Sequence, residues 1–307
     1  MMSITNYIAE IGAREHKLAM RDLKPLSGLD FAEREAFWPA WRAIMPARRD
    51  EIAQAMVELA EDNVDLDFRA ALFWMLDDED AGVRVAAIEG LWEDLSGRLM
   101  RRLLTLLRED PSPGVRAGAA LALSRFAYQS VLGELADAET AELRTALVGA
   151  MLDEEQPLDV HRRALESAGY FADALEVQRE IERASAGDEQ LLHESALVAM
   201  GRSMLPRWLP TIGGALSHIS PALRYEAARA AGEMAEDARA LVPRLVPLLD
   251  DGDSEVALAA IWALGQIGGE PARRALQRAR KSGDETRSQA ASEALEELSL
   301  DDGLLGS

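Results

Sequence analysis

The chain contains no cysteine, few aromatic residues and no long hydrophobic run. The absence of cysteine excludes disulfide bonds, thiolate nucleophiles and cysteine-ligated zinc or iron–sulfur centres. The longest unbroken apolar run, VALAAIWAL at residues 256–264, is far shorter than a membrane-spanning helix requires. Glu10 lies where a signal peptide would need an apolar core. We therefore expect a soluble, cytoplasmic protein with no membrane partner.

Positive charge is also scarce. The 33 lysines and arginines are outnumbered by 54 aspartates and glutamates, which gives a formal net charge of −21. Such a chain repels phosphate backbones, so nucleic acid is disfavoured as a partner. Aromatic residues make up 5% of the chain against 48% hydrophobic residues, so the apolar side chains are largely alanine and leucine, which favour helices.

Seven segments of the sequence resemble one another. They are VRVAAIEGLW from Val83, VRAGAALALS from Val115, VHRRALESAG from Val160, LHESALVAMG from Leu192, LRYEAARAAG from Leu223, VALAAIWALG from Val256 and TRSQAASEAL from Thr286. Their starts are separated by 32, 45, 32, 31, 33 and 30 residues. A nearly fixed period in this range is typical of stacked helical repeats. The extra residues around 126–140 indicate an irregular repeat or a short inserted helix that bends the stack.

Small residues recur at fixed positions of these segments. The fifth residue is alanine in all seven, and the tenth is glycine in four: Gly169, Gly201, Gly232 and Gly265. Alanine at a fixed position lets neighbouring helices approach to the usual spacing of about 8–10 Å. We therefore predict that this column is buried between stacked repeats.

A second set of segments alternates with the first. Apolar residues recur at three- and four-residue steps, which is typical of amphipathic helices, in residues 64–77, 97–110, 140–155, 173–187, 204–218, 238–253 and 270–284. Ser112 and Ser220, each followed by proline, and Asp80 and Asp253 stand at predicted helix N-caps. No β-strand pattern is persuasive.

The pattern D/S-x-x-V/L-R-x-x-A-A-x-A-L-G, followed by a helix such as LVPRLVPLLDD, resembles HEAT repeats, and most closely the short HEAT-like repeats of phycobilisome lyases. One segment carries it as Ser220, Leu223, Arg224, Ala227, Ala228, Ala231 and Gly232. The resemblance implies an all-α, right-handed α-solenoid (α-α superhelix) of about eight helix pairs. It also implies that the second helices line a concave face and that protein binding is the commonest role. We expect an N-terminal helical cap at 1–29, the solenoid at 30–299 and a flexible tail at 300–307.

We accordingly predict a non-catalytic scaffold or adaptor that binds a protein or peptide along the concave face. No motif indicates a cofactor, a metal site or a nucleophile–base pair, and the oligomeric state stays open. The alternative is a bilin-lyase-like or other HEAT-type accessory enzyme, and a nucleic-acid-binding protein is a third reading.

One basic patch interrupts the acidic background. Within residues 270–281, five cations against Glu270 give a local charge of +4, from Arg273, Arg274, Arg278, Arg280 and Lys281. The functional interpretation is docking of an acidic partner segment or a phosphate; the alternative is an ordinary charged helix. Trp208, between two prolines, is a further predicted contact on the concave face.

The residue after the first aliphatic position is basic or histidine in most segments. This column contains Arg84, Arg116, His161, His193 and Arg224. We interpret it as a structural ladder that meets acidic caps of neighbouring repeats. A metal shared by His161 and His193 is disfavoured, because stacking would separate their backbones by about 10 Å.

The alanine column gives the first testable prediction. Replacing Ala227 by leucine should overpack the stack and lower the free energy of unfolding by about 1–3 kcal/mol. Thermal unfolding of the variant measures this, and an unchanged melting temperature would refute burial of the column.

Overall fold

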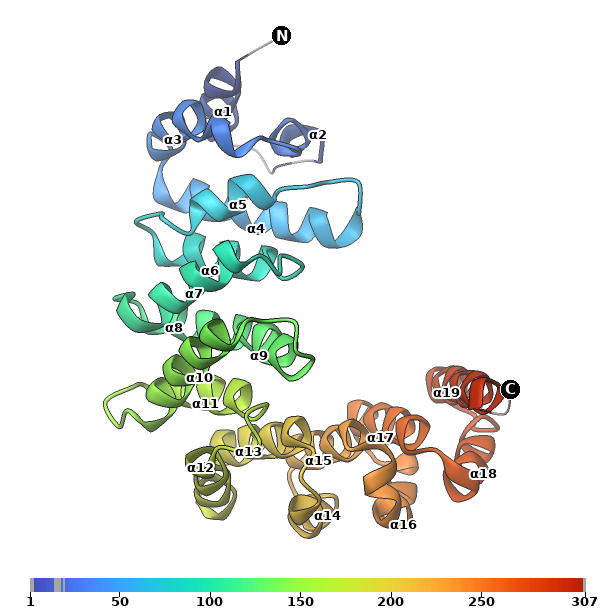
Figure 1. Ribbon diagram of the computed structural model, residues 1–307. Coiled ribbons are helices and arrows are strands. Elements are labelled where there is room, and N and C mark those ends of the chain that lie inside the picture. Colours follow the sequence, from blue (N-terminus) through green and yellow to red (C-terminus); the bar gives the residue numbers. More distant parts are fainter. Residues whose placement is uncertain (1–2, 14–17, 19, 306–307) are drawn as a thin grey trace. The chain divides into compact units, whose positions relative to one another are not determined.

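The protein is an all-α solenoid, seen here in a computed structural model that describes residues 3–13, 18 and 20–305 (Figure 1). Those residues contain no β-strand. None of the described helices is long and apolar enough to cross a membrane. The chain divides into two compact units. Unit 1 comprises Met1–Ser130, Leu135–Ala146 and Asp153–His161, and unit 2 comprises Val131–Glu134, Leu147–Leu152 and Arg162–Ser307.

Unit 1 begins with a group of short helices and continues as stacked pairs. In order these are α1 (Ile4–Ala13), α2 (Met20–Leu23), η1 (Lys24–Leu26), η2 (Phe31–Glu33), α3 (Arg34–Arg42), α4 (Pro46–Asp62), α5 (Arg69–Met75), α6 (Ala81–Gly90), α7 (Gly97–Glu109), α8 (Pro113–Ala122) and α9 (Ser124–Val131). Helix α1 packs on α3 and buries Ile8 and Ile11 completely. Helix α9 lies in the stretch predicted to hold an insertion, and the division between the units falls next to it.

Unit 2 continues the alternation of helices. Two helices, α10 (Asp137–Leu152) and α11 (Leu158–Ala168), are shared between the units. There follow α12 (Leu175–Ala186), α13 (Gln190–Ser203), η3 (Pro206–Trp208), α14 (Leu209–Ala215), α15 (Pro221–Glu233), η4 (Ala235–Leu241), α16 (Val242–Leu245), η5 (Val246–Asp250), α17 (Ser254–Ile267), α18 (Gly269–Ala279) and α19 (Glu285–Leu305).

All seven segments that share the alanine column form helices: α6, α8, α11, α13, α15, α17 and α19. We call these the opening helices. Six of the seven column alanines are fully buried, namely Ala87, Ala119, Ala164, Ala196, Ala227 and Ala260. The seventh, Ala290 of α19, is half-buried. The predicted burial of the column is therefore confirmed in the first six segments.

The glycines at the tenth position bring opening helices of unit 2 almost into backbone contact. A Cβ placed on Gly201 would lie 2.9 Å from the Cα of Ala230, and one on Gly169 would lie 2.8 Å from the Cα of Ala199. A Cβ on Gly232 would overlap the Trp262 ring. Since real Cβ atoms do not approach so closely, these positions require glycine for steric reasons.

This close approach identifies the inner layer of unit 2. Helices α13, α15, α17 and α19 pack successively on one another, and Figure 1 shows α13, α15 and α17 in one row with α12, α14, α16 and α18 in another. Tighter spacing in one layer curves a stack toward that layer, so the inner side of unit 2 is formed by opening helices. The family resemblance had led us to expect second helices there. The small residues of the opening helices reverse that expectation, because they let these helices, and not the second helices, approach most closely.

Several predicted details differ in the structure. The second segment at 238–253 is not one helix but η4, α16 and η5, because Pro243 and Pro247 lack the amide hydrogens that a continuous α-helix needs. The predicted flexible tail starts at residue 300, whereas α19 extends to Leu305, since no proline interrupts it. Residues 306–307 lie outside the described part of the chain.

The helix caps are also of two kinds. Asp80 and Asp253 cap their helices as predicted, accepting backbone hydrogen bonds of 2.8 Å and 3.0 Å. Ser112 and Ser220 occupy the N-cap position without a capping bond. Proline at the next position already fixes helical φ there, so the helices begin without side-chain capping.

The second prediction concerns the glycine contacts. Replacing Gly201 by alanine should push α13 and α15 apart and destabilise the protein by about 1–3 kcal/mol, despite alanine's better helix propensity. The matched control is Gly149→Ala in α10, where no atom lies within 4 Å of the new Cβ, so the change should be neutral or stabilising by up to about 1 kcal/mol. Urea unfolding measures the stability of both variants. If Gly201→Ala were as stable as Gly149→Ala, the helices would be able to move apart at Gly201 without cost, and the prediction would be wrong.

Candidate partner-binding surface

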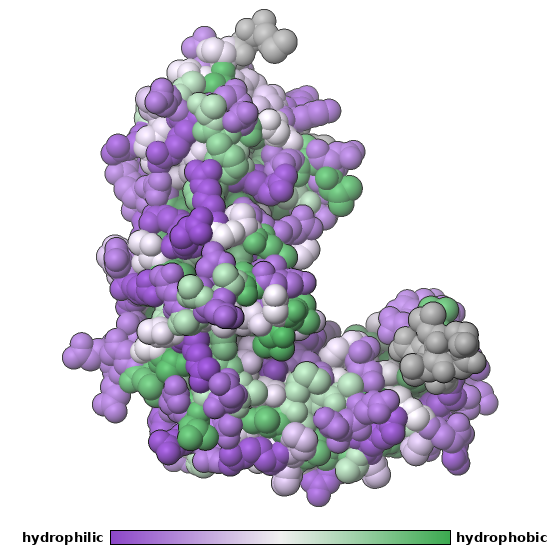
Figure 2. Space-filling model, viewed as in Figure 1, coloured by the Kyte–Doolittle hydropathy of each residue, from purple (hydrophilic) through white to green (hydrophobic). Residues whose placement is uncertain are grey.

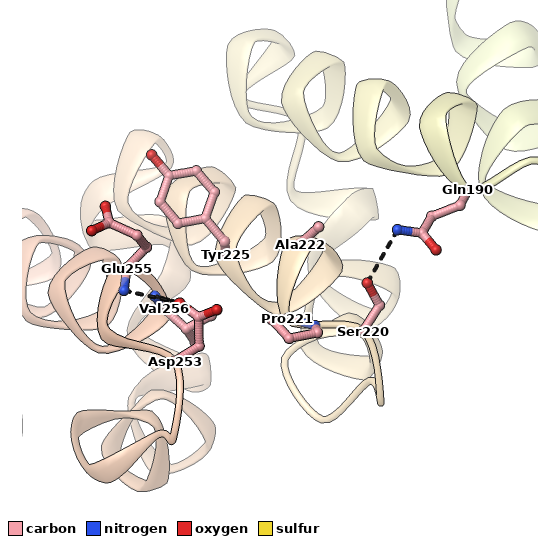
Figure 3. A pocket seen from close by; sticks show the side chains of 8 residues that line it. All are labelled: Gln190, Ser220, Pro221, Ala222, Tyr225, Asp253, Glu255 and Val256. Atoms are coloured by element: carbon pink, nitrogen blue, oxygen red, sulfur yellow. Dashed lines mark hydrogen bonds between the residues drawn. The ribbon is translucent and has the colours of Figure 1, made fainter.

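The face of α13, α15, α17 and α19 that points away from the second helices carries three hollows; we call this inner face of unit 2 the opening-helix surface. The first hollow has a volume of about 540 Å³ and lies where α13, α15 and α17 begin (Figure 3). It is lined by Gln190, Ser220, Pro221, Ala222, Tyr225, Asp253, Glu255 and Val256. The side chain of Gln190 donates a hydrogen bond to the Ser220 hydroxyl (3.3 Å), which links the start of α13 to that of α15.

Two further hollows lie between α17 and α19. Their volumes are about 610 Å³ and 140 Å³, and they share Leu258, Ala290 and Glu293 as lining residues. The smaller one adds Ile261, Trp262, Ala294 and Glu297. All three hollows draw lining residues from α17: Val256 belongs to the first hollow and Leu258 to the other two.

The lining combines apolar side chains with carboxylates. Aspartate and glutamate supply five lining residues, Asp253, Glu255, Glu285, Glu293 and Glu297, and none of the residues that line the three hollows is basic. Tyr225, Leu258 and Trp262 are half-buried. The lining is therefore amphipathic. Apolar and hydrophilic residues are also interspersed over the face of the molecule that Figure 2 draws.

Arg229 lies beside the hollows and already has partners. Its guanidinium carbon lies 4.9 Å from the centre of the Trp262 ring, and its Nη2 lies 3.7 Å from Glu233. A cation over an indole face is attracted by the electron-rich ring. Arg229 therefore holds Trp262 against α15, where the ring covers Gly232.

Glu226, next to Tyr225 on α15, lies in an unfavourable environment for its charge. Burial and, to a smaller extent, the nearby carboxylate of Glu166 raise its pKa to about 7, and Arg229 opposes this shift. Glu166 is 3% exposed, and Arg163 and Ser195 donate hydrogen bonds to it of 2.8 Å and 2.7 Å. Glu226 is thus a half-buried carboxyl group near a second carboxylate, Glu166, whose hydrogen bonds come from Arg163 and Ser195.

The basic column lies in the first turn of the opening helices, and its arginine side chains reach the connections between helices. Arg84 donates two hydrogen bonds of 2.8 Å to the buried carboxylate of Asp110 and a third to the carbonyl of Asp78. Arg224 does the same with Asp251 in unit 2, which holds the pKa of that carboxyl below its usual range. Arg116 contacts the neutral Gln156 instead (3.1 Å). These side chains join turns of neighbouring repeats.

The two histidines of the column belong to different units. His161 lies in unit 1, whereas His193 lies in unit 2 beside His218, with ring centres 6.2 Å apart. Burial lowers the pKa of His193, and His218 lowers it further. No cluster of three His, Asp or Glu side chains in the described residues is arranged to hold a metal ion.

The basic patch lies on α18, which is a second helix and not part of the opening-helix surface. Four of its side chains, Arg274, Arg278, Arg280 and Lys281, are exposed, and Arg273 is half-buried. Arg274 pairs with Glu270 at 3.0 Å. Trp208 was expected to contact a partner, but it is 3% exposed and belongs to the core. The expectation for Trp208 is therefore wrong: its ring fills the interior below the short helix η3.

Sequence reasoning missed Tyr225, Leu258 and Trp262. A signal for them was present, because they occupy the third or seventh position of the repeated pattern, on the side opposite the alanine column. Large apolar residues on an exposed helix face are informative when they cluster. Their clustering depends on the stacking of α15, α17 and α19, which one segment alone does not reveal.

Stacked helix pairs with a buried small-residue column define an α-solenoid of repeats. A sequence profile of HEAT repeats matches residues 69–167 and 209–296, which is more than half of the chain. The chain therefore belongs to the HEAT-repeat family, as its sequence pattern predicted. Comparison with curated protein sequences gives no match.

Solved structures share this fold at low sequence identity. A chain of the Kap95:Nup1 complex has a TM-score of 0.52 at 13% identity, over 96% of this chain and 46% of that one. The complex of CpcE and CpcF of phycocyanin lyase from Nostoc sp. PCC7120 has a TM-score of 0.49 at 17% identity, over 75% of this chain and 94% of that one. Human deoxyhypusine hydroxylase has a TM-score of 0.38 at 15% identity, with 96% of each chain covered. At these identities the similarity concerns the fold alone.

The environment of Glu226 gives the third prediction. Its folded-state pKa of about 7 lies above the unfolded value of 4.5, so the folded protein binds the extra proton and stability falls as pH rises through this window. Glu226→Gln should therefore stabilise the protein by about 1–3 kcal/mol at about pH 8 and have little effect below about pH 5.

Urea unfolding at these two pH values measures the effect. The control is Glu296→Gln, an exposed carboxylate of α19, which should change stability equally little at both. A gain at Glu226→Gln that does not depend on pH would contradict the assignment.

Proposed function

We propose that this protein is a non-catalytic adaptor that binds a partner protein or peptide along the opening-helix surface of unit 2. The observation that carries the proposal is the row of three hollows across α13 to α19, each with apolar residues among its lining. Concave, largely apolar sites with a few polar groups are where proteins bind ligands most often.

The side chains in these hollows suit protein recognition. Tyrosine and tryptophan are the residues most enriched at binding hot spots, and Tyr225 and Trp262 supply one of each on neighbouring helices. Trp262 is held by Arg229 and by the backbone of α15, so little side-chain freedom would be lost on binding. A partner would thus meet a surface that is already ordered.

The similarity to known folds agrees with this proposal. The solved neighbour with the TM-score of 0.52 is a complex of two proteins, Kap95 and Nup1. An extended stack of repeats offers a long surface on which many weak contacts add up. The accessory-enzyme alternative would instead rest on Glu226, because a carboxyl group with a pKa near 7 suits proton transfer.

The basic patch on α18 is a second candidate contact surface. Its exposed arginines could bind carboxylates or phosphates through charge-assisted hydrogen bonds. Because α18 is a second helix, this patch and the opening-helix surface can be changed separately.

The fourth prediction tests which surface binds. A photo-reactive residue at position 258, or at position 175 as a control, would cross-link partners in the cell that makes the protein. Each partner would then be purified and its Kd measured. The Tyr225→Ser, Leu258→Ser double variant should weaken binding about tenfold or more, the loss typical of hot-spot residues. Leu175→Ser, which removes a leucine that is 61% exposed on α12, should not.

Charge reversal of Arg273, Arg274 and Arg278 completes the set. A partner that is weakened by this reversal and not by the double variant would place the binding surface on α18 and overturn the proposal. Release of a chemically altered partner on incubation would favour the accessory-enzyme alternative.

A further inference from the structure

We infer that the partner segment on the opening-helix surface is basic and amphipathic: lysine or arginine side chains occur in it together with aliphatic or aromatic ones. This inference rests on the proposed function, because it names the chemistry of the occupant of the same surface. It is argued from the charge, the apolar lining and the spacing of the three hollows.

The lining of the hollows carries negative charge and no positive charge of its own, although Arg224 acts electrostatically on Asp253. Their lining contains five carboxylates and no lysine or arginine. Arg229, the nearby cation, is engaged by Trp262 and Glu233. The charge of Glu226, next to Tyr225 in the sequence, is disfavoured by burial and then by other carboxylates, and a nearby cation from a partner would favour it. Electrostatic complementarity therefore selects a basic segment and rejects an acidic one.

The apolar lining indicates that the partner segment carries apolar side chains as well as cations. Pro221, Ala222 and Val256 line the first hollow, and Leu258, Ile261 and Trp262 line the hollows beside α19. Val256 and Ile261 are already buried, but a purely charged segment would leave Pro221, Ala222, Leu258 and Trp262 in contact with water. Aliphatic or aromatic anchors would cover them, at about 25 cal/mol per Å² of apolar area removed from water.

The arrangement also sets the length of the segment. The hollows extend from α13 to α19, which are successive members of one layer. With about 10 Å between neighbouring helices, this path is about 30 Å long. An extended chain covers that distance with about nine residues, at about 3.3 Å for each. Anchors and cations would both recur along it, because each hollow combines apolar lining residues with carboxylates.

The fifth prediction uses defined peptides with the full-length protein. The first probe is a fluorescent peptide of about twelve residues in which lysine alternates with leucine and tryptophan. A second probe carries glutamate for each lysine, and a third carries serine for each leucine and tryptophan. Fluorescence anisotropy should give a Kd for the first probe that is about tenfold or more below those of the other two.

Two triple variants distinguish the effect of charge on the opening-helix surface from the effect of the protein's overall charge on peptide binding. Neutralising Glu255, Glu293 and Glu297 to glutamine should weaken binding of the first probe about tenfold. The control neutralises three exposed carboxylates outside this surface: Glu176→Gln, Glu236→Gln and Asp237→Asn. It should change the Kd less than about twofold, because distant exposed charges are screened by salt.

Each outcome decides the inference. Equal weakening by both triple variants would mean that the peptide responds to net charge alone, and tighter binding of the glutamate probe would mean that the occupant is acidic; either result overturns it. The proposed function fails separately: it survives a negative peptide result if a natural partner still depends on Tyr225 and Leu258, and it fails if no partner does.

Discussion

Close contact between successive opening helices is the constraint on which unit 2 depends. Gly169, Gly201 and Gly232 have no room for a Cβ, and the alanine column next to them is buried. This contact sets the spacing of α13, α15, α17 and α19, and therefore the distance between side chains on the opening-helix surface. The hollows exist because the helices are close enough to share them. A larger residue in the column would separate the helices and change the binding surface together with the stability.

Charge has two distinct roles in this acidic protein. At the turns, Arg84 and Arg224 each bind a carboxylate with two hydrogen bonds, so charge there fixes the geometry of neighbouring repeats. On the opening-helix surface the carboxylates are in excess, and the charge of Glu226 is disfavoured by burial and then by its neighbours. Paired charges serve the fold, whereas a surplus of one sign is available for recognition. The net charge of −21 alone does not separate these roles.

The sequence predicted the fold closely because repetition amplifies weak signals. A single alanine-rich helix does not indicate how it packs. Seven segments that share an alanine at the same position identify a stacked architecture. Predictions failed where a single residue decided the outcome. Pro243 and Pro247 divided a second helix into short pieces, and Trp208 is buried although its neighbours suggested a surface position. Periodicity describes a face of a helix on average, and it does not say which large side chain turns inward at one position.

The sequence by itself determined the helical repeat, the buried alanine column, the arginines of the basic column and the acidic character of the chain. These follow from local spacing, since residues three and four apart share a helix face. Only the tertiary structure decided that opening helices form the inner layer of unit 2, that Leu258 and Trp262 line one hollow, and that Tyr225 lines another. The physical reason is that these facts depend on distances between helices some thirty residues apart in the chain. Those distances are set by which small side chains meet across the interface.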